Sequence, residues 1–144
     1  DGNNYGFLEI IDEYGLSDAA NLSKFYAGAS YLKLGNYENA INYLDEFSSS
    51  DLLIQARAYS LIGDAYVEIG DYDNAIYYFK KASNENPNEF FTPSYLLKLA
   101  IVYEETGDLE SALDTYEEII EEFKNSPEFQ TSLKNKSRIE GLLL

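Results

Sequence analysis

Cysteine, histidine, methionine and tryptophan are all missing from this 144-residue sequence. Without cysteine there is no disulfide framework and no thiolate, so redox chemistry does not indicate the compartment. The absence of both histidine and cysteine removes the commonest zinc ligands, the usual general base and most pairs of nucleophile and base. The sequence therefore predicts a protein that is not an enzyme and that uses no cofactor.

Positive charge is also scarce, because ten Lys and Arg residues face 26 Asp and Glu residues, for a formal net charge of −16. A charge of this size repels phosphate backbones and anionic lipids alike. We therefore expect no nucleic-acid partner and no direct membrane contact. A neutral or basic partner would be attracted, although an acidic surface more often serves only solubility.

Long hydrophobic runs are absent as well, since the run over residues 76–79 is among the longest. A membrane-spanning helix needs about 20 apolar residues. The chain is nevertheless 45% hydrophobic and 15% aromatic, with 14 Tyr and 8 Phe, which is enough to bury the core of one domain. The sequence opens at Asp1 without Met, and we interpret it as part of a longer or processed chain.

Three segments repeat the same pattern, over residues 27–41, 62–76 and 99–113. In each, a small residue precedes a tyrosine by three positions, so that both lie on one face of a helix. A glycine then ends the helix, and the next helix carries an alanine followed four positions later by a large side chain. Each copy therefore predicts two antiparallel helices. The glycines are Gly35, Gly70 and Gly107, and the alanine pairs are Ala40 with Leu44, Ala75 with Phe79, and Ala112 with Tyr116.

The second copy has the fullest set of signature residues, which are Tyr59, Ile62, Gly63, Tyr66, Ala75, Phe79 and Pro87. These residues and their spacing resemble the tetratricopeptide repeat (TPR), whose period is about 34 residues. The resemblance implies an all-α fold, a right-handed α-solenoid of helix hairpins closed by a C-terminal capping helix. The expected divisions of the single domain 1–144 are a half repeat over 5–16, repeats over 21–50, 56–88 and 93–126, and the capping helix over 127–144.

The segment after Pro127 predicts one helix, and two interpretations of it stay open. It covers the third repeat, as the ends of solenoids require, or it is a separate binding helix. At the other end, residues 10–14 followed by alanine-rich repeats resemble bacterial TPR proteins with an amino-terminal membrane anchor, including the ancillary subunit of the Sec translocon. This resemblance implies an extracytoplasmic domain tethered to the inner membrane, which assists assembly or translocation of envelope proteins. A cytoplasmic location is the alternative.

By resemblance, the first helix of each repeat lines a concave groove that binds a segment of a partner protein. The groove residues carried over are Leu22, Phe25, Ala29, Leu32, Lys33, Arg57, Ser60, Asp64, Val67, Leu97, Ile101 and Glu104. Lys33 and Arg57 are the only basic residues among them, so a clamp for a terminal carboxylate is not expected. The predicted partner is a protein or peptide, neutral to basic, with apolar anchors.

Three alternatives compete with this groove. For Leu22 and Phe25, packing on neighbouring helices or on an upstream repeat is as well supported as contact with a ligand. The apolar end 142–144 is consistent with a structural or oligomerisation module, including a homo-oligomer. The carboxylates over 117–122 lie side by side on a helix, but without histidine or a constraining loop we expect them to stay hydrated rather than bind a metal. Asp71 begins a stretch that resembles a calcium loop, and Ile76 occupies the position where that loop needs glycine.

Overall fold

A computed structural model describes residues 18–144 of the protein, and within this range every regular element is a helix. The predicted all-α solenoid is confirmed. The half repeat predicted over residues 5–16 lies outside the described range. The helices are α2 (Asp18–Lys33), α3 (Tyr37–Glu46), α4 (Leu52–Ile69), α5 (Tyr72–Asn84), α6 (Thr92–Glu105), α7 (Leu109–Glu122) and α8 (Glu128–Leu142).

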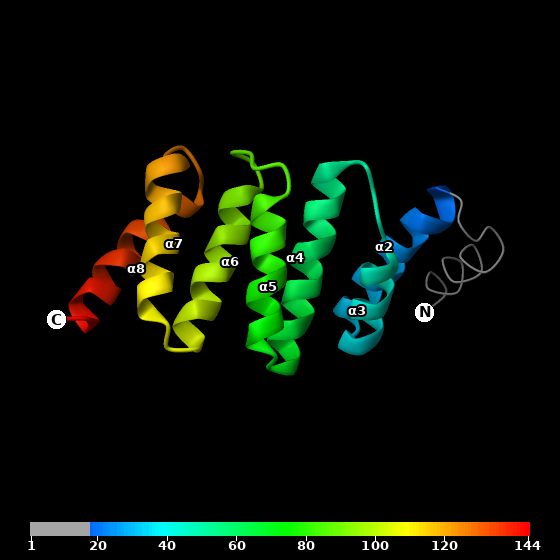
Figure 1. The fold of residues 1–144 in the computed structure, drawn as a ribbon, viewed down its shortest axis with the longest axis horizontal. Coiled ribbons are helices and arrows are strands. Elements are labelled where there is room, and N and C mark those ends of the chain that lie inside the picture. Colours follow the sequence, from blue (N-terminus) through cyan, green and yellow to red (C-terminus); the bar gives the residue numbers. More distant parts are fainter. Residues whose placement is uncertain (1–17) are drawn as a thin grey trace.

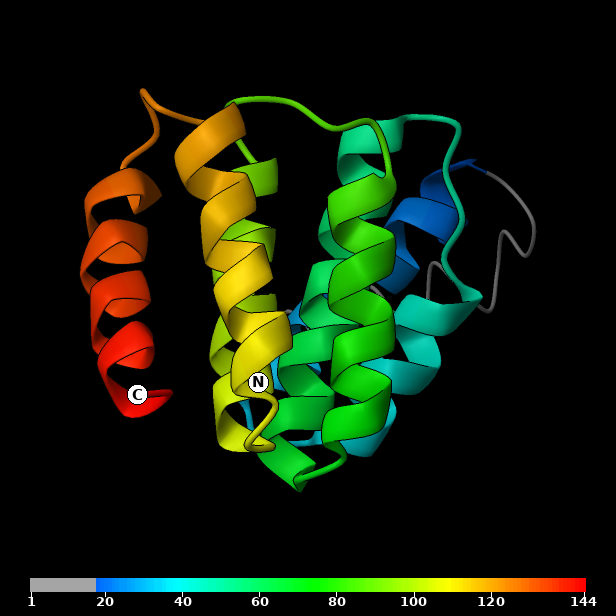
Figure 2. The same ribbon diagram turned by 60° about the vertical axis from the view of Figure 1, so that its left-hand side comes forward.

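Successive helices lie side by side in a row, with α2 towards one end and α8 at the other (Figure 1). The view turned by 60° shows the same neighbours (Figure 2). The pairs α2 with α3, α4 with α5 and α6 with α7 form hairpins, and α3 packs on α4, α5 on α6 and α7 on α8. Direct contacts also join α2 to α4 and α6 to α8, and an ion pair joins Asp64 of α4 to Lys98 of α6. The first helices of the three hairpins therefore border one surface.

Capping residues define the ends of the helices. The Asp51 side chain accepts hydrogen bonds from the backbone amides of Leu53 and Ile54, and α4 therefore begins at Leu52, ahead of the predicted repeat start at residue 56. Gly70, after α4, has a φ of +79°, and Gly35 and Gly107 have similar positive values. These glycines end the first helix of each hairpin, as predicted, because the left-handed conformation carries no steric penalty for glycine.

Close helix contacts depend on glycine facing a large side chain. A Cβ atom on Gly63 would lie 2.6 Å from Cε1 of Phe79, and one on Gly28 would lie 2.5 Å from Cγ of Leu44. Leu44 and Phe79 are both 1% exposed. The small-then-large pattern of the sequence is thus a pattern of complementary shapes that brings α2 onto α3 and α4 onto α5.

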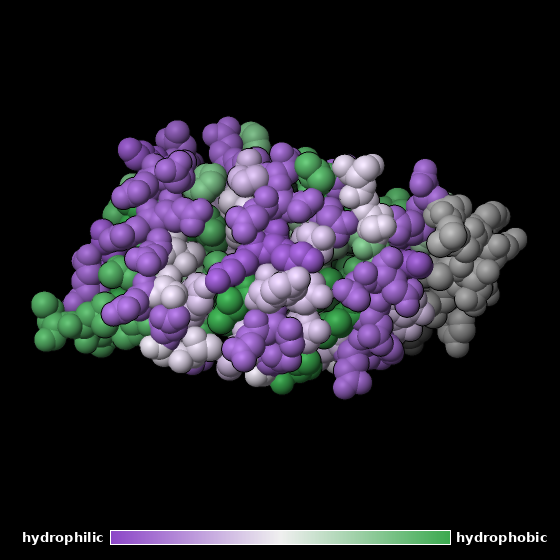
Figure 3. Space-filling model, viewed as in Figure 1, coloured by the Kyte–Doolittle hydropathy of each residue, from purple (hydrophilic) through white to green (hydrophobic). Residues whose placement is uncertain are grey.

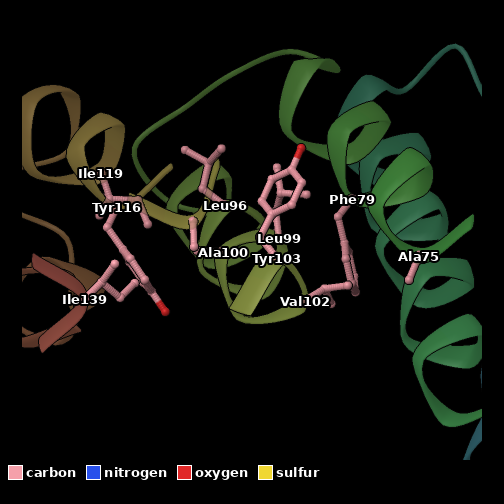
Figure 4. Close-up of a cluster of buried hydrophobic side chains, with 11 residues drawn as sticks. Ala75, Phe79, Leu96, Leu99, Ala100, Val102, Tyr103, Tyr116, Ile119 and Ile139 are labelled. Carbon is pink, nitrogen blue, oxygen red and sulfur yellow. The ribbon is translucent and has the colours of Figure 1, made fainter. Parts of the chain in front are cut away.

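The main core runs from α5 to α8 and includes side chains from all four helices. Tyr116 and Ile119 of α7 point towards Ile139 of α8, and Phe79 lies against the α6 side chains (Figure 4). Tyr116, Ile119 and Ile139 are all 0% exposed. The segment predicted to cover the third repeat is therefore packed on the core through Ile139.

A stacked pair of tyrosines in the second hairpin is linked to the first hairpin by a hydrogen bond. The rings of Tyr66 and Tyr78 are stacked with centroids 5.6 Å apart, and the Tyr78 hydroxyl donates a hydrogen bond of 3.3 Å to Asp45 of α3. Burial raises the pKa of Tyr78 to about 12, with a further contribution from the Asp45 carboxylate. Burial likewise raises the pKa of Tyr66 above its ordinary value. Ionisation of either phenol therefore opposes folding.

These tyrosines predict loss of stability in alkali. The folded chain keeps the Tyr78 proton to about pH 12, whereas an unfolded tyrosine loses it near pH 10. Below pH 10 the contribution of Tyr78 is constant, and it falls between pH 10 and 12 because the folded state then binds more protons than the unfolded state. Urea unfolding at pH 8, 10 and 11 is expected to show this fall, and a Tyr78→Phe variant should show a shallower one. Equal slopes for the two proteins would contradict the prediction.

Candidate groove on the first helices

Two neighbouring pockets lie along the surface shared by α2, α4 and α6. The pocket between α2 and α4 has a volume of about 450 Å³, and its lining is Leu22, Phe25, Tyr26, Ala29, Leu32, Lys33, Ile54, Arg57 and Leu61. The pocket between α4 and α6 has a volume of about 380 Å³, and its lining is Leu32, Tyr37, Asp64, Val67, Glu68, Phe79, Lys98, Ile101 and Val102. Leu32 borders both. We call the two together the groove.

Nine of the twelve groove residues predicted from the sequence border one or other pocket. Phe25 does so while also packing inside, where it is 8% exposed and 5.3 Å from the Phe47 ring, centroid to centroid. Leu22 and Ile101 are more open, with 39% and 46% of their surface exposed. Ser60, Leu97 and Glu104 border neither of these two pockets.

The Glu104 side chain contacts the end of the solenoid instead. It accepts hydrogen bonds of 2.6 Å from the Tyr116 hydroxyl and 2.6 Å from Nη2 of Arg138, which forms an ion pair with it. Asn135 of α8 donates to the Tyr116 hydroxyl at 3.1 Å. Glu104 therefore connects α6 to α7 and α8, and its carboxylate is already paired within the domain.

Lys98 is a groove residue that the sequence prediction omitted. Its Nζ lies 2.8 Å from Oδ2 and 2.9 Å from Oδ1 of Asp64, and 3.4 Å from the hydroxyl of the buried Ser60. Lys98 therefore adds a third cation to Lys33 and Arg57, the only basic residues among the twelve predicted positions. The helical spacing held a signal for it, because Lys98 stands three positions before Ile101 and so shares its face.

Asp64 is consequently not a free carboxylate. Its ion pair with Lys98 crosses from α4 to α6, and the two side chains are 31% and 39% exposed. An ion pair at this level of exposure is worth at most about 1 kcal/mol. It also joins the two helices that border the α4–α6 pocket, where Glu68 accepts a hydrogen bond of 3.4 Å from the Tyr37 hydroxyl.

The acidic stretch of α7 has partners of its own. Oε1 of Glu117 is 3.0 Å from Nζ of Lys136. Burial raises the pKa of Glu118, with a smaller contribution from the neighbouring Glu122 carboxylate.

Over residues 18–144, no group of three or more acidic, histidine or cysteine side chains is arranged to hold a metal ion. In the same range no helix has the length and apolar character needed to cross a bilayer.

The paired helices and their shared surface define an α-solenoid built of helix hairpins. Two family models described as tetratricopeptide repeat match the chain over residues 27–89 and 66–136. The chain belongs to the tetratricopeptide-repeat family, as its signature residues predicted.

Solved structures share this fold. A crystal structure of MamA superimposes with a TM-score of 0.79 at 23% sequence identity, over 98% of this chain and 77% of that one. PcrH, solved in complex with the chaperone binding region of PopB, superimposes with a TM-score of 0.66 at 18% identity, over 88% of this chain and 97% of that one. A search of curated proteins found no match. At these identities the structural neighbours establish the fold alone.

Proposed function

We propose that this protein is a non-catalytic interaction scaffold that binds a segment of a partner protein in the groove. The observation that carries the proposal is the continuity of the two pockets, which Leu32 joins into one surface. Pockets of about 300–1,000 Å³ with mostly apolar walls and a few polar groups are typical binding sites. Exposed apolar side chains such as Leu22 and Ile101 are available there as contacts for apolar anchors.

Membership of the TPR family supports a protein or peptide as the ligand. PcrH, which shares the fold, binds the chaperone binding region of PopB, and this is a precedent for a partner segment on such a solenoid. The net charge of −16 favours partners that are neutral to basic overall, because complementary charge speeds encounter. We also propose that the protein assists the assembly or translocation of envelope proteins, as a domain tethered to the bacterial inner membrane.

A structural or oligomerisation module is the second candidate, and exposed leucines favour it. Leu142 and Leu143 are 63% and 49% exposed at the end of α8. Figure 3 shows a mostly hydrophilic face with apolar side chains gathered at this end of the molecule. Light scattering at high protein concentration tests this candidate, since a monomer there would count against it.

The groove proposal predicts that a charge placed in the α4–α6 pocket abolishes partner binding. Ile101→Glu puts a carboxylate where the pocket has an apolar wall, and burial of that charge by a ligand would cost affinity. We expect the loss of at least one specific partner in crosslinking within cells that produce the protein. A tenfold loss of affinity corresponds to about 1.4 kcal/mol, well within the effect of a central contact.

Ile69→Glu is the matched control for this experiment. Ile69 is 46% exposed, as Ile101 is, and borders neither pocket. Both variants should keep the helical circular dichroism and lie within about 0.5 kcal/mol of the parent in unfolding free energy, as exposed substitutions usually do. If Ile101→Glu retains every partner of the parent protein, binding occurs on another surface and the groove proposal is wrong.

A further inference from the structure

The two pockets of the groove differ in the sign of their charge. Lys33 and Arg57 line the α2–α4 pocket, which has no acidic residue in its lining. Both side chains belong to exposed residues, and neither forms an ion pair with any residue of the described range 18–144. On a protein with a net charge of −16, this pocket lining has a positive charge that no acidic side chain of residues 18–144 pairs with.

The α4–α6 pocket has the opposite balance. Its charged lining is Asp64, Glu68 and Lys98, and Lys98 is paired with Asp64. Glu68 is left as an exposed carboxylate whose one hydrogen bond in the described structure comes from the Tyr37 hydroxyl, at 3.4 Å. The net charge of this lining is therefore negative, and the group that carries it faces solvent.

A single helix holds the two charges at a fixed separation. Arg57 and Glu68 both belong to α4 and are eleven residues apart, close to three helical turns, so they lie on the same face. At 1.5 Å per residue, their Cα atoms are about 16 Å apart along the helix axis. Since a helix backbone is stiff, a ligand meets the positive and negative sites in a constant order and spacing.

We propose that the groove selects a charge-ordered partner segment. One apolar side chain with an adjacent Asp or Glu occupies the α2–α4 pocket beside Arg57, and a second with an adjacent Lys or Arg occupies the α4–α6 pocket beside Glu68. Charge complementarity of this kind discriminates between partners and fixes the direction in which the segment runs. The inference rests on the proposed function and specifies the ligand of that same groove.

The separation of Arg57 and Glu68 also sets how many residues separate the acidic and basic side chains of the ligand. About 16 Å corresponds to about five residues of an extended segment at roughly 3.3 Å each, or to about eleven residues of a helix. The spacing of acidic and basic residues in bound peptides therefore reports the conformation that the groove accepts. Overall net charge is a weaker criterion, because a segment with one charge of each sign satisfies both pockets while remaining neutral.

Selection from a library of random 16-residue peptides tests this inference. Peptides displayed on phage are enriched on the purified protein, and those that lose binding to Ile101→Glu are kept as groove ligands. The expected result is a family of peptides with two apolar anchors, an acidic residue beside one and a basic residue beside the other, always in the same order. In calorimetry, Arg57→Glu and Glu68→Lys should each weaken such a peptide at least tenfold.

Exchanged charges provide the decisive comparison. A peptide whose acidic residue is changed to Lys should bind Arg57→Glu better than it binds the parent protein. The controls are Lys134→Glu and Glu110→Lys, which make the same net-charge changes at exposed positions outside both pockets and should leave affinity within about twofold.

The possible failures are distinct. Groove peptides without ordered charges, or with unchanged affinity for Arg57→Glu, would overturn the charge-ordered segment and leave the proposed function standing. If no enriched peptide is sensitive to Ile101→Glu, or if none is enriched, both the inference and groove binding are overturned.

Discussion

Replacing Tyr116 by alanine is expected to lower the free energy of unfolding by about 3–5 kcal/mol, the usual cost of deleting a large buried aromatic side chain. Tyr116 is fully buried and packs in the cluster that α5, α6, α7 and α8 share. Its hydroxyl also donates to Glu104 of α6 and accepts from Asn135 of α8. Urea unfolding followed by circular dichroism measures the loss.

Two further variants separate the contributions of Tyr116. Tyr116→Phe keeps the ring and removes the hydroxyl, so it should cost about 1–3 kcal/mol, because Oε1 of Glu104 and the Asn135 amide each lose this hydrogen bond. Phe90→Ala removes an aromatic side chain that is 79% exposed, and it should stay within about 0.5 kcal/mol of the parent. If Tyr116→Ala were as mild as Phe90→Ala, α8 would not depend on this residue for its packing.

Gly63→Ala is expected to destabilise the protein by about 1–3 kcal/mol, the usual cost of overpacking a core, although alanine favours helices. The added Cβ would lie 2.6 and 2.7 Å from two atoms of the Phe79 ring, which real Cβ atoms essentially never do. Phe79 is 1% exposed and has little room to retreat. The same urea titration measures the effect.

Gly141→Ala is the matched control, because this glycine also lies within a helix and a Cβ there meets nothing within 4 Å. That substitution should leave stability unchanged or raise it, by up to about 1 kcal/mol. Combining Gly63→Ala with Phe79→Leu should give a double variant more stable than the sum of the single effects, since the smaller side chain relieves the overlap. If the effects of the two substitutions on unfolding free energy were strictly additive, the smaller side chain at position 79 would not be what relieves the overlap, and the α4–α5 contact would accommodate the added methyl group in another way.

The candidate site was only partly predictable. Of the positions carried over from the repeat pattern, Asp64, Val67 and Ile101 line the α4–α6 pocket. The repeat pattern does not predict which charged side chains form ion pairs. The ion pair of Lys98 with Asp64, two residues that are 34 positions apart, was therefore not predicted. Glu104 was assigned to the ligand surface for the same reason, although Arg138 pairs with it from α8.

Local chemistry accounts for the helices themselves. Glycine ends the first helix at Gly35, Gly70 and Gly107 because it accepts positive φ, and the spacing of small and large residues selects the face that packs. These effects act within a few residues, so they are visible in the sequence alone. The all-α fold and the hairpin repeat follow from them.

Contacts between hairpins are decided only when the chain is folded. The arrangement of the hairpins brings Lys98 to Asp64, and Arg138 to Glu104, and places Leu32 between two pockets. Each of these depends on distances of a few ångström between residues far apart in the chain, whereas sequence periodicity specifies only the face of a helix. The charge order of the groove is accordingly a property of the tertiary structure, because neutralisation of one carboxylate and exposure of another depend on which side chains meet.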